Sequence, residues 1–430
     1  MLRAACIFIA CRPGALSFPP SRAGDRLPDT IIIVGAGHAG TQGAEALRRE
    51  GFTGHIVLIG AEPHLPYQRP PLSKKLLAGE LEFARALLKP ASFYEQSHVE
   101  LRLGTRVSGI SCAEHQVTLS DGGRLEYQRL LLCLGSRGRP LAVPGAELAG
   151  VFELRTLDDM NGLRSRIRPG ARLVVVGAGY IGLEVAATCL QLGLDVTVLE
   201  MTERAMGRVV APQLSAFYAA EHAARGVKLH FNTLVSTIAG DTEVREVVCA
   251  DGRRFPADAV VVGIGILPVT DIALAAGIAC DNGIVVDEHC RTSAPDVFAA
   301  GDCTNHPSPR YGRRVRLESV DHAFEHARSA AANMLGKNIV HDKVPWFWSD
   351  QYDLKLLIVG LSQGYDQCAL RGDPAARSFC LCYLRNGELI ALDAVNDAKN
   401  YMAARKLIAE RVRLDAGRIA DTSIPLRDAH

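Results

Sequence analysis

The chain has 430 residues, of which 48% are apolar and 22% charged, and its formal net charge is +1. This length exceeds what a single hydrophobic core serves and predicts about two to four domains of ~100–200 residues. The composition excludes a disordered chain, and the near-zero net charge gives no overall attraction to nucleic acid or to a membrane surface. No stretch is long and apolar enough to span a bilayer, so we expect a soluble, cytoplasmic protein.

Residues 1–29 differ in composition from the rest of the chain. They contain four arginines, no acidic residue before Asp25, four prolines and one short apolar run. The prolines argue against the clean helix of a targeting peptide. We expect a disordered extension or a start codon assigned too early.

The twelve cysteines are scattered, with no Cys-x-x-Cys pair and no Cys/His spacing typical of zinc. We therefore expect no metal site, and buried thiols in a reducing compartment. Cys380 and Cys382 are two residues apart in a strand-like run, so their side chains should share one face.

Two segments far apart in the chain repeat one pattern. The first spans 30–59 and contains the glycine turn Gly35–Gly40, and the second spans 172–200 and contains Gly177–Gly182. Each consists of an apolar β-branched strand, the glycine turn, an amphipathic helix and a second apolar strand. This order predicts two βαβ units, each in a parallel sheet that is covered on both faces.

Both turns have the sequence Gly-x-Gly-x-x-Gly. In a dinucleotide site the first glycine makes the turn, the second lets the backbone approach the diphosphate, and the third lets the helix pack on the strand. The helix N-terminus supplies unpaired N–H groups and a partial positive charge. Because both turns follow strands and open helices, the sequence predicts two bound dinucleotides.

The acid at the end of the second strand selects the nucleotide. Glu200 follows Gly177 by 23 residues, where a carboxylate accepts from adenosine ribose hydroxyls and repels a 2′-phosphate. This favours NADH over NADPH, although Arg204 and Arg208 lie close behind. Glu200 as a solvated residue at a strand end is the alternative. In the first unit the expected acid is displaced to Glu62, which departs from the pattern.

The remaining chain adds strands and one helix, and then changes in composition. Strand-like runs lie within 226–263 and 284–302, and a helical run covers 319–335. From about residue 344 an aromatic-rich series of strands indicates a separate domain. The predicted fold class is α/β, with two dinucleotide-binding (Rossmann-like) βαβ domains and a C-terminal α+β domain.

Four motifs carry a more specific likeness, namely Pro63–Lys74, Gly177–Ala187, Val297–Asp302 and Pro345–Gln351. On these residues the chain, from about Thr30 to its end, resembles the NADH-dependent ferredoxin reductases of oxygenase systems. The resemblance implies a glutathione-reductase-like architecture. After an extension at 1–29, it consists of a split FAD domain (30–145 and 267–337), an NAD domain (146–266) and a C-terminal α+β domain (338–430).

The resemblance also implies where FAD and NAD(H) bind. The cofactor-binding residues that we expect are Gly35, Gly37, Ala39, Gly40, Glu62, Arg69, Lys74, Val107, Arg139, Gly177, Gly179, Tyr180, Ile181, Gly182, Glu184, Glu200, Arg208, Gly265, Asp302, Glu318 and Val320. The usual Ala-Thr-Gly motif before the NAD domain reads Cys133-Leu134-Gly135 here, so a threonine hydroxyl is missing.

In the family, hydride passes from NADH to FAD, and electrons then leave singly to a [2Fe–2S] ferredoxin. The resemblance implies that Lys74 and Glu184 lie beside the isoalloxazine, where the lysine stabilises reduced flavin and the glutamate compensates that charge. The residues alone favour a solvated loop lysine and a carboxylate at a helix start. Trp348 could lie between flavin and docking surface, or it could be a core residue.

An acidic ferredoxin would require a local basic patch. Arg310, Arg313, Arg314 and Arg316 lie in a stretch without an acid, and Lys406 is a further candidate. An ordinary solvated face explains such a run equally well. We expect a monomer or a weak homodimer.

Other classes of protein share the two dinucleotide-binding units. A disulfide reductase is excluded, because it needs a cysteine pair beside the flavin and residues 63–95 contain no cysteine. The same lack argues against a peroxidase, whereas a simple NADH oxidase stays open. A flavin- and NADH-binding signalling protein of the apoptosis-inducing-factor type is the alternative from another class.

Overall fold

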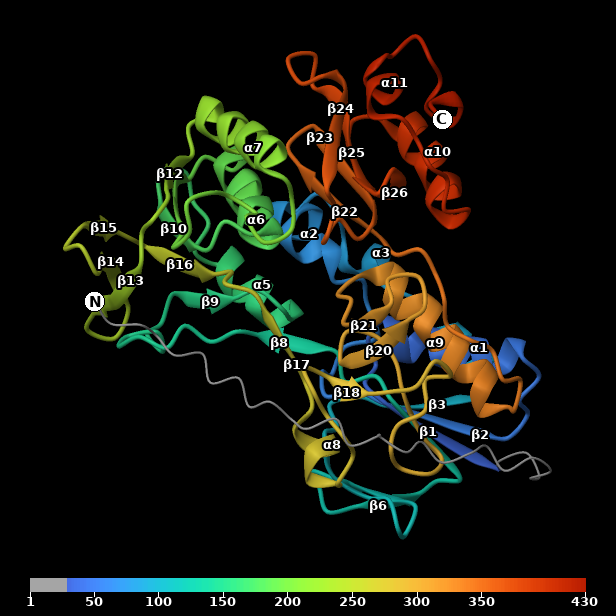
Figure 1. The fold of residues 1–430 in the computed structure, drawn as a ribbon. Coiled ribbons are helices and arrows are strands. Elements are labelled where there is room, and N and C mark those ends of the chain that lie inside the picture. Colours follow the sequence, from blue (N-terminus) through green and yellow to red (C-terminus); the bar gives the residue numbers. More distant parts are fainter. Residues whose placement is uncertain (1–28) are drawn as a thin grey trace, which may run out of the picture.

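The computed structural model describes residues 29–430 (Figure 1). Apart from Asp29, the expected extension at 1–29 lies outside the described residues. Three regions follow one another in Figure 1, from blue through green to red, and the yellow and orange segment returns to the blue one. Within residues 29–430 no helix is long and apolar enough to cross a membrane.

The first sheet is parallel and has the strand order β19-β7-β1-β2-β3. Its strands are β1 (Thr30–Val34), β2 (His55–Ile59), β3 (Val99–Arg102), β7 (Arg129–Leu132) and β19 (Val297–Ala299). The side chains of Ile31, Ile32 and Ile33 are fully buried, as expected for a strand covered on both faces. Because β19 pairs with β7, residues from the two separate stretches that we assigned to the FAD domain share one sheet.

Two helices cover one face of this sheet and pack on each other, α1 (His38–Arg49) and α9 (Val320–Met334). Ser319 caps α9, because its side chain accepts from the backbone N–H of His322. Short strands and one short helix lie on and beside the other face: β4 (Val107–Ser111), β5 (Gln116–Leu119), β6 (Arg124–Glu126), β18 (Ile284–Val285), β20 (Thr304–Ser308), β21 (Arg313–Val315) and α8 (Asp271–Ala275).

The second sheet, with the order β12-β11-β10-β16-β9, is also parallel. Its strands are β9 (Val151–Glu153), β10 (Arg172–Val176), β11 (Asp195–Leu199), β12 (Lys228–His230) and β16 (Ala259–Val262). Helices α5 (Leu157–Arg164), α6 (Tyr180–Gln191) and α7 (Pro212–Arg225) pack against it, as does the antiparallel sheet of β13 (Val235–Gly240), β14 (Val244–Cys249) and β15 (Arg254–Pro256). The ribbon of β8 (Ser136–Gly138) and β17 (Ile266–Pro268) connects this region with the first.

The third sheet is antiparallel, with the order β22-β23-β26-β25-β24. Its strands are β22 (Trp346–Gln351), β23 (Leu354–Gly360), β24 (Gln367–Asp373), β25 (Ser378–Arg385) and β26 (Glu388–Val395), followed by α10 (Ala398–Ala409), α11 (Ala416–Ala420) and the short η2 (Leu426–Asp428). Cys380 and Cys382 both lie in the core between β25 and α10, as predicted. This sheet with its helices is the predicted α+β region.

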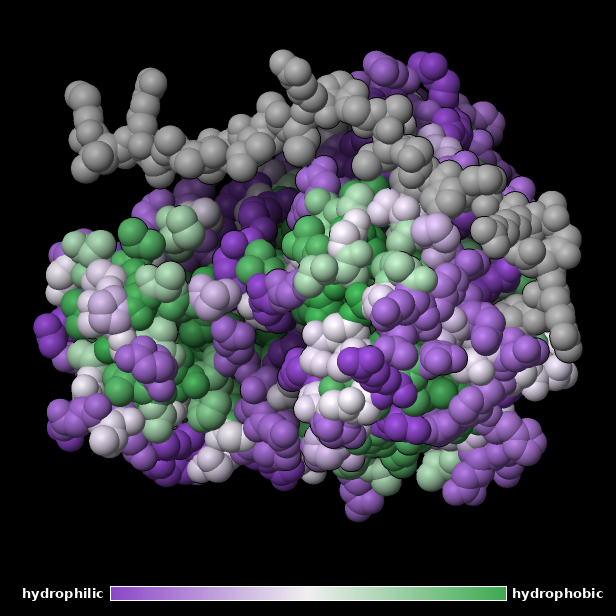
Figure 2. All heavy atoms as spheres, turned by 90° about the horizontal axis from the view of Figure 1, so that it is seen from below, coloured by the Kyte–Doolittle hydropathy of each residue, from purple (hydrophilic) through white to green (hydrophobic). Residues whose placement is uncertain are grey.

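Short helical segments link β2 to β3: η1 (Pro70–Ser73), α2 (Lys75–Ala78), α3 (Phe83–Ala86) and α4 (Ala91–Gln96). Of these, η1 and α2 contact α6 of the second region. Seen from below (Figure 2), the surface has groups of apolar residues separated by hydrophilic ones. The link formed by η1 and α2 brings residues from different regions together at the candidate site.

Candidate active site

The first glycine turn forms an open cradle at the N-terminus of α1. Gly35 has a φ of +109°, and a Cβ there would lie 2.1 Å from the carbonyl oxygen of Cys133. A Cβ on Gly40 would lie 1.9 Å from the carbonyl oxygen of Gly35, so both positions exclude a side chain. Gly37, in contrast, has nothing within 4 Å of its Cβ position. The turn therefore has the tight backbone and the free space that a diphosphate needs.

The second turn repeats this geometry at the N-terminus of α6. A Cβ on Gly177 would lie 2.5 Å from the Gly263 carbonyl oxygen, and one on Gly182 would lie 2.1 Å from that of Gly177. The nearest atom to a Cβ on Gly179 is 3.8 Å away. Both turns fit a dinucleotide, because each opens a helix and no atom crowds the Cβ position of its middle glycine.

Glu200 lies against the second turn. Its Oε2 accepts from the backbone N–H of Ala178 at 2.8 Å, and its Oε1 accepts from the N–H of Thr202 at 2.8 Å. Oε1 also accepts from the hydroxyl of Thr202 at 2.7 Å. These bonds fix the carboxylate beside the glycine turn, and Oε2 keeps acceptor capacity for a ribose hydroxyl.

The other residues assigned to the second nucleotide surround the same turn. Ile181 is 44% exposed, which is high for so apolar a residue. Tyr180 packs against Phe347 of β22, with ring centroids 4.9 Å apart. The guanidinium of Arg208 lies 3.2 Å from the Cβ position of Gly265, so these two predicted residues are neighbours.

Glu62 is bound within the protein in a way that the sequence did not indicate. Its Oε1 accepts from Arg69 at 2.6 Å and its Oε2 accepts from the hydroxyl of Tyr67. Arg69 also donates to the carbonyl oxygen of Arg155. The two predicted residues are thus partners of each other, and a role of Glu62 toward ribose stays a prediction.

Asp302 follows β19 and lies near the first turn. It accepts from the hydroxyl of Ser136 at 3.1 Å, and Arg155 lies 3.7 Å away. Desolvation, followed by the charges of Arg69 and Arg155, lowers the pKa of His38 to about 3, so its imidazole is neutral at pH 7. Arg155 belongs to no recognisable motif, and His38 occupies a variable position of the first glycine turn, so the sequence did not indicate a role for either.

The remaining predicted residues are found on several elements. Val107 is buried at the start of β4, and Val320 is the first residue of α9. Arg139 is exposed, and its backbone N–H donates to the carbonyl oxygen of Gly265 at 2.9 Å. Glu318 forms an ion pair with Arg316.

Lys74 and Glu184 form the predicted ion pair. The Nζ of Lys74 lies 2.6 Å from the Oε2 of Glu184, whose side chain is 2% exposed. The hydroxyl of Ser73 donates to the same oxygen at 2.6 Å, and that of Ser349 donates to Oε1 at 2.7 Å. One buried carboxylate on α6 therefore joins η1 and β22, so three regions of the chain meet at it.

Trp348 is half-buried on β22, one residue before Ser349. Its ring centroid lies 5.5 Å from that of Trp346 and 6.4 Å from that of Phe347. This partial exposure, next to Ser349, is compatible both with a place between the flavin and the docking surface and with a role in the core.

The basic residues predicted for docking fall into two groups. Arg310 donates to the carbonyl oxygen of Ile408 at 2.8 Å, and Arg314 donates to that of Val286 at 2.6 Å. These two guanidiniums are engaged within the protein, and docking through them stays a prediction. Arg313 is exposed and donates to the side-chain oxygen of Gln363, and Lys406, whose side chain is 78% exposed, lies 3.8 Å from the Oε1 of Glu410.

The ten cysteines among residues 29–430 are free thiols. Burial raises the pKa of several of them, and for Cys189 and Cys303 to about 12. Such thiols are protonated at pH 7 and poor nucleophiles. The site around Lys74 therefore has no cysteine chemistry to offer.

Comparison with known proteins identifies the architecture. Residues 29–327 match the family described as pyridine nucleotide-disulphide oxidoreductase, and residues 346–430 match the one described as reductase C-terminal. The chain belongs to the pyridine nucleotide-disulphide oxidoreductase family. Membership in this family implies sites for FAD and NAD(H), which the two glycine cradles fit.

This oxidoreductase is similar to named ferredoxin reductases over most of its length. It is 45% identical over 401 residues to the 5,5'-dehydrodivanillate O-demethylase ferredoxin reductase subunit of a Sphingobium species, covering 92% of this chain and 97% of that one. It is 42% identical over 406 residues to putidaredoxin reductase of Pseudomonas putida, covering 93% and 96%.

A solved structure agrees with these similarities. The structure of the covalent putidaredoxin reductase–putidaredoxin complex matches with a TM-score of 0.91 at 41% identity, covering 94% of this chain and 98% of that chain. The predicted fold class and the resemblance to ferredoxin reductases are thereby confirmed for this oxidoreductase.

Proposed function

We propose that this oxidoreductase takes hydride from NADH through a bound FAD and passes single electrons to a [2Fe–2S] ferredoxin of an oxygenase system. Its relatives are named as ferredoxin reductases, and one solved relative is in complex with putidaredoxin. Within this chain, the observation that carries the proposal is the Lys74–Glu184 ion pair, held by Ser349 where three regions meet.

The chain's own residues bind and position the two cofactors. FAD, when bound, supplies the chemistry that accepts a hydride and releases electrons one at a time. Gly37 and Gly179 leave room for the two diphosphates, and Asp302 offers a carboxylate to a ribityl hydroxyl. Lys74 provides a positive charge to stabilise negative charge on the flavin, and Glu184 compensates that lysine. No acid–base nucleophile is required.

The preference for NADH rests on Glu200. Its carboxylate is fixed by the N–H groups of Ala178 and Thr202, directly beside the second glycine turn. A 2′-phosphate on the adenosine ribose would bring a second negative charge to this carboxylate.

The electron acceptor is an acidic protein. It binds to a local cluster of positive charge, because the net charge of the whole chain is only +1. Of the predicted docking residues, Arg313 and Lys406 are exposed. Trp348, half-buried on β22, lies between the region of Lys74 and the surface in this proposal. We propose that the protein acts as a monomer or a weak homodimer.

The test is an anaerobic reaction of the purified yellow holoprotein with NADH and a [2Fe–2S] ferredoxin, followed by visible absorption. We expect two ferredoxins to be bleached for each NADH consumed, because a hydride carries two electrons. A ferredoxin that stays oxidised while NADH is consumed only in air would identify an oxidase instead. A colourless protein that takes up no flavin on reconstitution would overturn the proposal altogether.

A further inference from the structure

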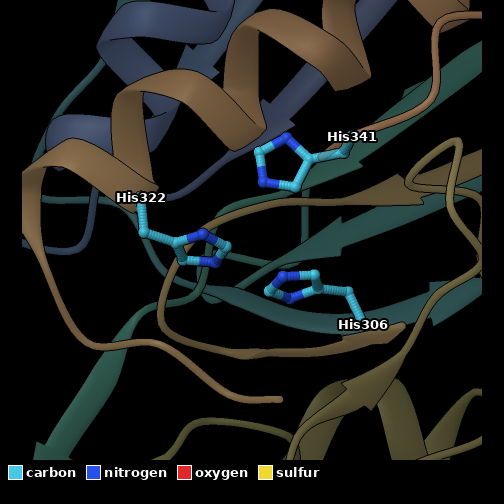
Figure 3. Close-up of side chains that lie close together, drawn as sticks. All are labelled: His306, His322 and His341. Atoms are coloured by element: carbon cyan, nitrogen blue, oxygen red, sulfur yellow. The ribbon is translucent and has the colours of Figure 1, made fainter. Parts of the chain in front are cut away.

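Three histidines converge in the interior (Figure 3). His306 belongs to β20, His322 to the first turn of α9, and His341 to the connection between α9 and β22. One ring nitrogen of each lies within 4.8 Å of those of the other two. Each residue is at most 5% exposed.

Each imidazole is neutral and therefore keeps a lone pair on one ring nitrogen. Burial lowers the pKa of His306 to about 3 and that of His341 to about 4, and it holds the pKa of His322 well below its usual range. A buried neutral imidazole is the form in which histidine binds a metal.

Hydrogen bonds orient two of the rings. The hydroxyl of Ser329 donates to the carbonyl oxygen of Glu325, so its oxygen accepts from the Nδ1 of His341 at 3.0 Å. This leaves the Nε2 of His341 as the nitrogen with the lone pair. The ring of His322 has a backbone hydrogen bond to Gly301. Such a bond on the second nitrogen is what fixes a histidine that binds a metal through the first.

The cluster also contains unsatisfied nitrogens. The Nδ1 of His306 and the Nε2 of His322 are buried and have no hydrogen-bond partner among the described residues, and the same holds for the Nε2 of the adjacent His326. Buried polar atoms in native proteins nearly always have a partner. Three buried nitrogens without a partner at one place indicate that an ion or a small polar molecule binds there.

We propose that His306, His322 and His341 bind a divalent transition-metal ion of the zinc type. Zinc–nitrogen bonds of ~2.0–2.1 Å place tetrahedral ligands ~3.4 Å apart, so the nitrogens, now within 4.8 Å, close by at most about 1.4 Å. The rings of His306 and His322 are stacked at 13° and turn apart when the metal binds. Asp321, Glu325, Asp342 and Lys343 line the same small cavity. Because Glu325 pairs with Arg328 and Lys343, the carboxylates that offset the added positive charge are those of Asp321 and Asp342.

None of the three histidines is among the residues assigned to FAD, NADH or ferredoxin, although His322 follows the assigned Val320 by two residues in α9. A metal there would join β20, the start of α9 and the chain that leads into β22. The alternative occupant of the cluster is a water molecule, and the experiment separates the two.

The experiment uses untagged holoprotein, stripped by a chelator and dialysed against Zn²⁺. We expect one zinc per chain by elemental analysis, and a thermal midpoint that rises with Zn²⁺ and falls again with chelator. His322→Asn and His341→Asn should each weaken zinc binding by at least tenfold. The matched control is His115→Asn, because His115 also packs on an aromatic ring, that of Tyr127, and its φ of 52° suits asparagine.

Substitution by Co²⁺ keeps the test decisive if a variant fails to retain flavin. Wild-type protein with Co²⁺ should show ligand-field bands of a tetrahedral nitrogen site, without a thiolate charge-transfer band. No zinc retained by the wild type, equal zinc in all variants, or a thiolate band from a cysteine elsewhere would each overturn the proposal. A water molecule as the occupant would give the first of these results.

Discussion

Ser349 donates a hydrogen bond of 2.7 Å to the Oε1 of Glu184 and so connects β22 to α6. On the other oxygen of this carboxylate, Ser73 and Lys74 each donate at 2.6 Å. The side chains of Glu184 and Ser349 are almost fully buried. The charge is therefore satisfied only while the three regions remain together, which makes the carboxylate both a structural and an electrostatic centre.

Removing the hydroxyl of Ser349 should loosen this junction. We expect Ser349→Ala to lower the free energy of unfolding by about 1–3 kcal/mol, because a buried charged acceptor loses a donor. Urea denaturation measures the loss. Ser378→Ala, on the exposed end of β25, is the control and should change little. Equal stability of both variants would contradict a role for this hydrogen bond.

The lysine should matter for the reaction as well as for the fold. We expect Lys74→Met to slow reduction of the flavin by NADH about 10- to 100-fold, because a charge near the developing anion is lost. Stopped-flow absorption measures the rate. Lys75→Met is a matched control, since Lys75 is adjacent and exposed. An unchanged rate in Lys74→Met, with flavin retained, would defeat the assignment of Lys74 to the flavin.

Glu200 should set the choice of nucleotide. Glu200→Gln keeps an oxygen acceptor for Ala178 but removes the charge that opposes a 2′-phosphate. We expect the ratio of kcat/KM for NADH to that for NADPH to fall about tenfold, or ~1.4 kcal/mol. Glu203→Ala changes an exposed acid nearby and should leave the ratio unaltered. An equal change of this ratio in both variants would show that the general negative charge of the region, and not the contact of Glu200 with the ribose, sets the preference.

Arg313 should contribute to docking. We expect Arg313→Gln to raise the KM for ferredoxin about threefold at low salt and to flatten its salt dependence, because steering by an exposed charge is screened by ions. Steady-state ferredoxin reduction at several salt concentrations provides the measurement. Arg124→Gln, at an exposed position of β6, is the control. A salt dependence identical to that of the wild type would remove Arg313 from the docking surface.

Asp393 should make stability depend on pH. Burial raises its pKa to about 7, and the hydroxyl of Tyr383 donates to it at 2.6 Å. Because the folded protein binds this proton more tightly than the unfolded chain, the stabilisation is present at low pH and is lost as the pH rises from about 4 to 7.

Between pH 5 and pH 8 the wild type should therefore lose about 2 kcal/mol more of its free energy of unfolding than Asp393→Asn. Urea denaturation at the two pH values gives the difference. Asp373→Asn, at the exposed end of β24, should follow the wild type. Parallel behaviour of wild type and Asp393→Asn would show that the carboxyl is ionised throughout.

The sequence predicted those features that depend on local pattern. Apolar strands followed by glycine turns indicated both βαβ units, since Gly35 and Gly177 occupy backbone conformations that other residues avoid. The helical run expected at 319–335 matches α9 to within a residue at each end. The Lys74–Glu184 pair came from the family resemblance, because 110 residues separate its members and no spacing rule joins them.

The features that remained hidden were set by contacts between distant segments. Arg310 and Arg314 looked like free surface charges, but backbone carbonyl oxygens of residues far along the chain take up their donors. Ser349 belongs to the motif Pro345–Gln351, but nothing in that motif indicated that its side chain contacts Glu184. The three histidines come from separate elements, so a search for metal-ligand spacing could not reveal them.

The position of β19 at the edge of the first sheet has a consequence for the order in which the protein forms. A ribosome releases β1, β2, β3 and β7 early, yet their edge partner, residues 297–299, emerges only after the entire second sheet has been made. The inserted region is continuous and able to fold first as a unit. Until β19 arrives, β7 keeps an unpaired edge, and unpaired strand edges promote pairing with other chains.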